Sequence, residues 1–241
     1  MSRVYTDTLE PRKPTQDITL GTAGETISVG ANSINVNTVA DKGGNTLWTS
    51  DGSGNLSSIN AGLKGNLILI STGTATDQAK FQITTGIDST YALYIVKMID
   101  IYAHTDGAEL EWNVSIDGGS SYGVAKTTTW IYAQHNEADT SATFGYDSNR
   151  VLHNSVNEQW LMENKENDAD SSGSGELWMF NFSGTTYVKH FLATTQGMQV
   201  GPGSYQAHIS GFVNTTSAIN ALYWRMNAGN ITGTFKLYGL S

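Results

Sequence analysis

The chain has 241 residues, enough for one large all-β domain or for one domain with an appendage. Only 15% of the residues are charged and the formal net charge is −9, which argues against nucleic acid as a partner, because binding phosphate requires a basic surface. The chain lacks cysteine, which excludes disulfides and thiolate metal sites, and its longest apolar-rich run, residues 91–103, is too short for a membrane span.

Residues 1–16 are predicted to be extended. Two of the three prolines, Pro11 and Pro14, lie in this segment, and each biases the residue before it away from helical conformation. The segment also has too little apolar surface to become ordered by itself. We therefore expect either a frayed terminus or an anchoring arm that becomes ordered on a partner.

Residues 17–36 contain a small repeat of three β-type pieces. Each piece places two apolar residues at positions i and i+2, and glycines separate the pieces, which are Asp17–Leu20, Thr26–Val29 and Ser33–Val36. A single short piece cannot bury such a stripe alone. The stripes pack either on the main domain or against copies from other chains around a shared axis. We favour the second arrangement, because the repeat is regular.

A hinge and a loop follow the repeat. Gly43-Gly44 and the polar segment Asp51–Asn55 flank the apolar Thr46–Trp48, and both flanking segments have the composition of turns. We place a domain boundary near residue 62. The chain is thereby divided into an arm (residues 1–16), a β-repeat stem and hinge (17–62) and a head (63–241).

The head is predicted to be all-β. Residues 91–103 are apolar on both faces, which indicates a central strand covered on both sides. At most one helical turn is expected, near residues 136–140 or 154–159. Many strands separated by frequent turns predict a β-sandwich of jelly-roll type. The expected strands are Leu67–Ser71, Ala79–Thr84, Tyr91–Ala103, Thr140–Tyr146, Glu158–Glu163, Glu176–Phe182, Thr186–Thr195, Tyr205–Val213, Ile219–Met226 and Ile231–Leu240.

Residues 110–133 predict a β-hairpin around which the head is organised. The first arm alternates, with Leu110, Trp112, Val114 and Ile116 on the face expected to be buried. Glu111, Asn113 and Ser115 occupy the face expected to be wet. Asp117-Gly118-Gly119 supplies the turn, because glycine adopts positive φ without a Cβ clash. The second arm is rich in the threonine, valine and aromatic residues that suit strands.

The segment Ser115–Tyr122 resembles the Asp-box pattern, S-x-D-x-G-x-(S/T)-aromatic, that occurs on hairpins of sialidases and other β proteins. In that pattern the aspartate is structural and caps backbone amides of the turn. Asp117 is expected to act in the same way, because an aspartate at a turn accepts hydrogen bonds from nearby N–H groups. One copy does not indicate a propeller or a sialidase.

No metal or cofactor site is expected. His135, Glu137 and Asp139 are clustered, but the chain lacks the His-x-x-x-His spacing of zinc sites, and a polar loop explains them better. Three acidic residues flank a Ser/Gly-rich loop but do not match the spacing of a calcium-binding loop; these are Asp168, Asp170 and Glu176.

An enzyme is not expected either, so no catalytic residue is assigned. Glu109 and Glu111 share one strand face and could form a glycosidase pair, but both are expected to face solvent. Four aromatic residues could form a sugar-stacking platform, although aromatics in strands more often belong to the core; these are Trp130, Tyr132, Trp160 and Trp178. The chain carries none of the common hydrolase, nucleotide-binding or metalloprotease motifs.

Taken in order, several segments resemble the C-terminal domains of bacteriophage virion structural proteins of the tail-fibre or capsid-fibre type, which are common among marine phages. The resemblance covers residues 67–241, and Thr8–Arg12 and Ile18–Val29 resemble the parts of the same proteins near their arms. It implies a β-sandwich head on a narrow, trimeric stem and supplies no catalytic residues. The segments are 88–91, Ile99–Gly107, Ser115–Tyr122, His135–Glu137, Gly184–His190, Phe212–Ala218 and Gly229–Leu240.

These observations lead us to expect a non-enzymatic virion component. Residues 1–40 would attach the protein to other virion proteins of the head or tail, three copies would associate, and the sandwich would project outward with a host-surface glycan as a candidate ligand. Two alternatives remain open at this stage. One is a capsid decoration protein that braces the shell, and the other is a carbohydrate-binding module.

Overall fold

The computed structural model describes residues 37–41, 43–53, 55–57, 59–60 and 66–240. The chain divides into two compact units, Met1–Leu63 and Lys64–Ser241, and the expected boundary near residue 62 falls beside this division. The expected arm (1–16) and the three apolar rungs between residues 17 and 36 lie outside the described residues, so both stay predictions.

The described part of the first unit is a small antiparallel sheet in the order β1-β2-β3. Its strands are β1 (Thr38–Ala40), β2 (Thr46–Ser50) and β3 (Leu56–Ser57). Turns at Gly44 and Gly52, both with positive φ, precede and follow β2, as the glycines around Thr46–Trp48 predict. The sequence predicts no strand over β1 or β3, because each is only two or three residues long.

The second unit is built from strands alone, which confirms the all-β, sandwich-like fold; the part of the chain that the structure describes contains no helix. The residues expected to form a helical turn, 136–140 and 154–159, form turns and strand ends instead. The strands are β4 (Leu67–Gln78), β5 (Phe81–Ile83), β6 (Leu93–Ala103), β7 (Ala108–Ser115), β8 (Lys126–Asn136), β9 (Ala142–Tyr146), β10 (Gln159–Lys165), β11 (Gly173–Phe180), β12 (Lys189–Gln199), β13 (Gly203–Val213), β14 (Ala221–Met226) and β15 (Ile231–Leu240).

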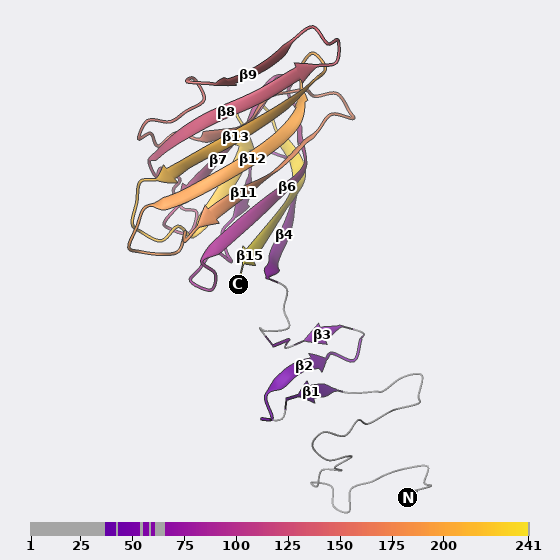
Figure 1. The fold of residues 1–241 in the computed structure, drawn as a ribbon, viewed down its shortest axis with the longest axis vertical. Coiled ribbons are helices and arrows are strands. Elements are labelled where there is room, and N and C mark those ends of the chain that lie inside the picture. The colour runs from indigo at the N-terminus through magenta and orange to yellow at the C-terminus, as the bar shows by residue number, and fades with distance from the viewer. Residues whose placement is uncertain (1–36, 42, 54, 58, 61–65, 241) are drawn as a thin grey trace, which may run out of the picture. The chain divides into compact units, whose positions relative to one another are not determined.

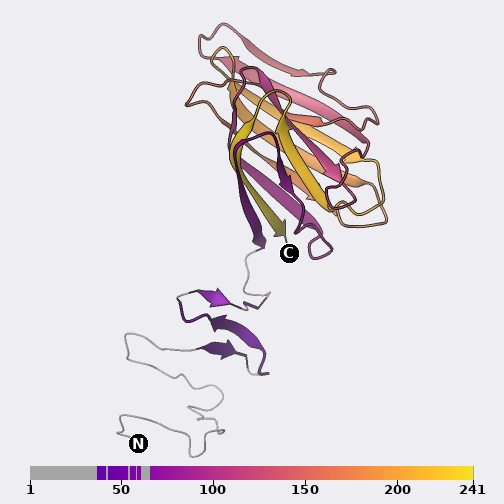
Figure 2. The same ribbon diagram turned by 180° about the vertical axis from the view of Figure 1, so that it is seen from behind.

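These strands form two antiparallel layers. The larger sheet has the order β4-β15-β6-β11-β12-β13-β8-β9, and Figure 1 shows these strands side by side. The smaller sheet has the order β5-β14-β7-β10, and its strands lie in front in Figure 2. One residue pair, Lys165 with Gln199, joins the two layers at the β10–β12 corner. The sandwich thus buries one face of each sheet against the other.

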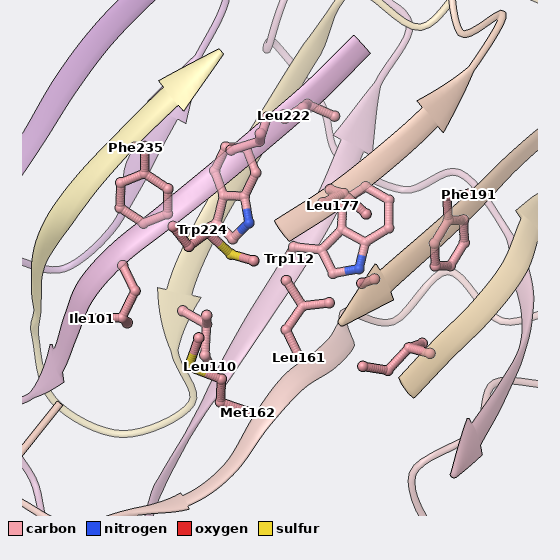
Figure 3. Close-up of a cluster of buried hydrophobic side chains, with 14 of the residues drawn as sticks. Ile101, Leu110, Trp112, Leu161, Met162, Leu177, Phe191, Leu222, Trp224 and Phe235 are labelled. Carbon is pink, nitrogen blue, oxygen red and sulfur yellow. The ribbon is translucent and has the colours of Figure 1, made fainter. Parts of the chain in front are cut away.

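The core lies between the two layers and combines many aliphatic side chains with large tryptophan and phenylalanine rings (Figure 3). Trp112 of β7 meets Phe191 of β12 edge to face, with ring centroids 5.0 Å apart. Trp224 of β14 packs against Phe235 of β15 at 5.1 Å. Each contact joins one sheet to the other. Full burial of side chains of this size contributes roughly 1.5–3 kcal/mol apiece, so these contacts hold the layers together.

The predicted hairpin over residues 110–133 is wrong in its pairing, although both of its arms are strands. β7 pairs with β10 and β14 in the smaller sheet, whereas β8 pairs with β13 and β9 in the larger sheet. Residues 116–125 therefore cross from one layer to the other. Alternation identifies a strand but carries no information about its partner, which is set by contacts distant in sequence.

The wet face predicted for β7 is also wrong. Leu110, Trp112 and Val114 are buried as expected, but Asn113 and Ser115 are buried as well, and Ile116 is 42% exposed. The segments before β8 and β10 cover the outer face: the Asn113 side-chain amide donates to the carbonyl oxygens of Tyr122 and Val156. A polar strand face can be buried where loops supply its hydrogen-bond partners.

β6 is a central strand, paired with β11 on one side and β15 on the other, as its two apolar faces predict. Its side chains do not keep a period-2 alternation over the whole length of the strand. Asp100 adopts φ = 52°, and both neighbouring strands shift register beside it. Tyr94, Val96 and Met98 point into the core before this bulge, and Ile101 does so after it. A bulge inserts one extra residue and so reverses the alternation, which a period-2 pattern cannot anticipate.

Three lysines are fully buried, an uncommon position for this residue type. The ammonium group of Lys126 donates to Asn113 Oδ1 at 2.6 Å and to the carbonyl of Val124. Lys165 donates to the carbonyls of Ser172 and Met198, and Lys189 donates to those of Tyr187 and Thr216. Each lysine therefore ties at least one loop carbonyl to the end of a strand.

A candidate functional site on the smaller sheet

The outer face of the smaller sheet carries a row of polar and aromatic side chains centred on Glu111 of β7. The register places Arg225 of β14 opposite Glu111 on one side and Trp160 of β10 opposite it on the other. Side chains directly opposite one another on adjacent strands interact. The Trp160 indole donates to Glu111 Oε1 at 2.7 Å, and Arg225 Nη2 lies 3.2 Å from Glu111 Oε2.

Two arginines each contact two glutamates in this region. Arg225 Nη2 lies 3.0 Å from Glu158 Oε1 in addition to its contact with Glu111. Arg150 holds the second pair, with Nη2 at 2.7 Å from Glu163 Oε1 and Nη1 at 3.5 Å from Glu109 Oε1. These groups are only partly screened by solvent, because the side chains of Glu109 and Arg150 are 13% and 18% exposed.

The sequence-based expectation that Glu109 and Glu111 face solvent is therefore wrong. Both do share the outer face of β7, but neighbouring strands and the segment 147–158 enclose them. Burial raises the pKa of Glu109 and of Glu111 above the usual glutamate value, against the opposing effects of Arg150 on the first and of Trp160 and Arg225 on the second.

Glu158 behaves differently from its neighbours. Burial opposes its ionisation, but a hydrogen bond from the Tyr223 hydroxyl and the charges of Arg225 and Lys126 outweigh that effect and lower its pKa. Burial, followed by its hydrogen bond with Glu158, raises the pKa of Tyr223. The site thus combines carboxyl groups that bind protons more tightly than usual with one that binds them less tightly.

A pocket of about 370 Å³ opens beside this row. Its lining combines carboxylate, guanidinium and amide groups with one indole ring, and the residues are Glu111, Asn149, Arg150, Val151, Leu152, Asn157, Glu158 and Trp160. The guanidinium of Arg150 stacks 3.5 Å from the centre of the Trp160 ring, so one face of the indole is occupied. The size and the convergent polar groups suit a small polar ligand such as one sugar unit.

The predicted aromatic platform does not form. Trp130 lies in the core, where its indole donates to the Tyr205 hydroxyl at 2.9 Å, and Tyr132 stacks on the Tyr205 ring. Trp178 lies on the opposite sheet, and Trp160 alone belongs to the pocket. Core packing, the more frequent role of strand aromatics, accounts for Trp130.

The Asp-box segment is a structural turn, as its sequence predicts. Asp117 Oδ1 accepts a hydrogen bond from the Ser121 amide at 2.9 Å, and its Oδ2 accepts one from the Ser121 hydroxyl at 2.6 Å. Hydrogen bonds from Ser115 and Ser121 lower the pKa of Asp117 to about 2. Gly118 and Gly119 both adopt positive φ. Both carboxylate oxygens of Asp117 therefore bind groups of the turn itself.

The other acidic clusters occupy separate places. His135 contacts Asp139 at 3.0 Å in an exposed turn, and Glu176 pairs with Lys97 at 3.3 Å on the larger sheet. Asp168 and Asp170 lie near Glu166, whose pKa is raised chiefly by burial and then by their charges. Among the residues that the structure describes, no group of three or more histidines and carboxylates is arranged to hold a metal ion.

Comparison with known proteins gives no assignment: no family model matches the chain, and no curated protein or solved structure is significantly similar to it. Over the described ranges, no helix is long and apolar enough to cross a membrane.

Proposed function

We propose that this chain is a non-enzymatic structural protein of a bacteriophage virion. It is a trimeric, fibre- or spike-like component that attaches to the particle through residues 1–40 and projects its sandwich head outward. The motif resemblance described above supports the virion assignment. A compact β-sandwich suits an exposed head, because its loops and outer faces can carry binding sites on a rigid scaffold.

The observation that carries the non-enzymatic part of the proposal is the pairing of the carboxylates around the pocket with arginine. Arg150 contacts Glu109 and Glu163, while Arg225 contacts Glu111 and Glu158. A glycosidase needs one carboxyl that is free to give its proton to the leaving group and a second that acts on the sugar. Carboxylates fixed by arginine serve better as rigid hydrogen-bond acceptors for a bound ligand.

Electron microscopy of the whole particle, with an antibody against the head, tests the virion assignment. We expect label at projecting fibres or spikes, and particles without label would refute the assignment.

A depolymerisation assay on host-surface polysaccharide tests the non-enzymatic part of the proposal. We expect no cleavage by the full-length protein. Cleavage that the changes Glu109→Gln or Glu111→Gln abolish would overturn it.

A second candidate function, a carbohydrate-binding module, is favoured by the pocket itself. The lining joins one indole, two asparagines and two carboxylates, a combination that hydrogen-bonds hydroxyl groups and packs against sugar carbons. A glycan array with the full-length protein and its Trp160→Ala variant tests this function. The Tyr187→Ala variant is the matched control, because that aromatic side chain is 72% exposed and lies outside the lining of the pocket. Glycan signals that are absent, or equal in all three proteins, would exclude the pocket as a glycan-binding site.

A further inference from the structure

Two neighbouring rows of side chains cross the outer face of the larger sheet and are almost entirely apolar. The strand register aligns one residue from each of six adjacent strands in each row. The first row contains Leu67, Leu240, Leu93, Phe180, His190 and Phe212. The second row contains Leu69, Tyr238, Ile95, Trp178, Leu192 and Ser210. We call these twelve residues the apolar band.

The apolar band faces away from the core. Ile95 is only 3% exposed, yet it lies outside the core cluster. The alternating residues of the same strands, including Leu177, Phe191 and Leu237, form the core instead. Leu69 and Leu192 are 52% and 50% exposed, which is high for leucine.

The apolar band covers a larger continuous area than single leucines scattered over a surface. Six strands at a spacing of about 4.8 Å span about 24 Å, and the two rows cover about 13 Å along the strands, which gives an area on the order of 300 Å². The largest apolar patch on the surface of a typical monomer has this size and is often functional. The area matches the apolar centre of an interface that buries about 800 Å² on each partner.

The band is also uncharged, in contrast to its surroundings. None of its twelve residues is acidic, lysine or arginine, whereas the adjacent row contains Lys236, Lys97 and Glu176. The chain as a whole has a net charge of −9, so two copies repel one another except where they meet through uncharged surface. A charged partner would find no complementary group here.

The place of the band in the chain favours a second copy as its occupant. Leu67, at its edge, follows the end of the first unit by only four residues. Copies joined through residues 17–62 would therefore hold the starting ends of their β4 strands close together, because four residues span at most about 14 Å. A hollow of about 340 Å³ between Phe180, Leu192 and Phe212 offers space for an apolar side chain from the second copy.

We propose that the apolar band is the surface through which the heads of two or three copies of this chain contact each other. This inference rests on the proposed homo-oligomeric function and assigns that association to six strands of the larger sheet.

Sedimentation velocity of the full-length protein tests the inference, with the double variant Leu69→Glu/Leu192→Glu. Both side chains are half exposed and point outward, so the fold tolerates the change, which circular dichroism and thermal unfolding would verify. The control is Thr74→Glu/Gln196→Glu, which adds the same charges to exposed positions of the same two strands and the same face, outside the band. If the glutamate variant does not fold, Leu69→Thr/Leu192→Thr replaces it.

We expect an oligomer in the wild type and the control, and an association at least about 100-fold weaker in the band variant, because a carboxylate buried without a partner is costly. An oligomer that survives in the band variant as in the control would refute the role of the band while leaving the proposed assembly intact. A wild type that stays monomeric at all concentrations would refute both.

Discussion

The buried lysines give the head an unusual dependence of stability on pH. Lys126 and Lys165 are 0% and 1% exposed, and burial lowers the pKa of each to about 8 from an ordinary value of 10.5. Between these two values the unfolded chain binds protons that the folded chain releases. The free energy of unfolding therefore rises with pH across this interval. Each lysine contributes a slope of about 1.3 kcal/mol per pH unit, or roughly 3 kcal/mol over the interval.

Two tyrosines limit this rise at its upper end. Burial raises the pKa of Tyr205 and of Tyr223 above the ordinary value of 10.0. Above pH 10 the unfolded chain loses tyrosine protons that the folded chain retains, so the free energy of unfolding falls again. The two effects together place the most stable pH of the head near pH 10, well above the usual range of pH 5 to 8.

Urea denaturation between pH 7.5 and 9.5, followed by tryptophan fluorescence, measures the slope. We expect an increase on the order of 2 kcal/mol per pH unit in the wild type. The variant Lys126→Met keeps the side-chain volume and should retain about half of that slope. Lys80→Met removes a lysine from an exposed position and serves as the control. A flat or falling profile in the wild type, or an unchanged slope in Lys126→Met, would refute the reasoning.

Three further predictions concern packing and turns. The change Trp112→Ala empties a fully buried site beside Phe191 and should lower the free energy of unfolding, measured by urea denaturation, by about 3–5 kcal/mol. The control Tyr187→Ala, at a position 72% exposed, should change the free energy of unfolding by less than about 0.5 kcal/mol. Gly211→Ala places a Cβ 2.5 Å from the Thr127 carbonyl oxygen and should cost about 1–3 kcal/mol by the same measurement, whereas Gly123→Ala enters open space and should cost little. Asp117→Asn should lower the melting temperature at neutral pH. The difference in melting temperature between variant and wild type should shrink as the pH falls from 3.8 to about 2, because the wild-type carboxylate becomes protonated over this range. An unchanged difference in melting temperature at pH 2 would contradict the capping role of Asp117.

The strands of the head could be predicted from sequence because each carries its own signal. The predicted strand Ile231–Leu240 has the bounds of β15, and its alternation between buried and half-buried residues is complete. Pairing could not be predicted in the same way. β7 and β8 look like two arms of a hairpin, yet their partners come from segments far along the chain, including residues 203–213 and 221–226.

The candidate site could be predicted only in part. The sequence predicts that Glu109 and Glu111 share one strand face and names Trp160 among the aromatics of a possible sugar-stacking platform. Their burial depends on Arg150 and Arg225, which are distant from β7 in sequence and adjacent to it in space. A signal was nevertheless available: Arg150 and Arg225 are the only arginines in residues 63–241, and both hold glutamates. A scarce charged residue in a strand that is otherwise apolar, such as Arg225 between Trp224 and Met226, indicates a fixed partner.

The two outer faces of the sandwich differ in a way that makes their roles separable. The smaller sheet presents ion-paired glutamates and a polar pocket, whereas the larger sheet presents an uncharged apolar band. A ligand bound at the pocket and a copy bound at the band would contact different strands. The Trp160→Ala variant should therefore leave the oligomer unchanged in sedimentation velocity. The band variant should keep the affinity of each pocket but lose the added avidity of several linked sites on a glycan-coated surface. Loss of association in Trp160→Ala would show that the two faces act as one site.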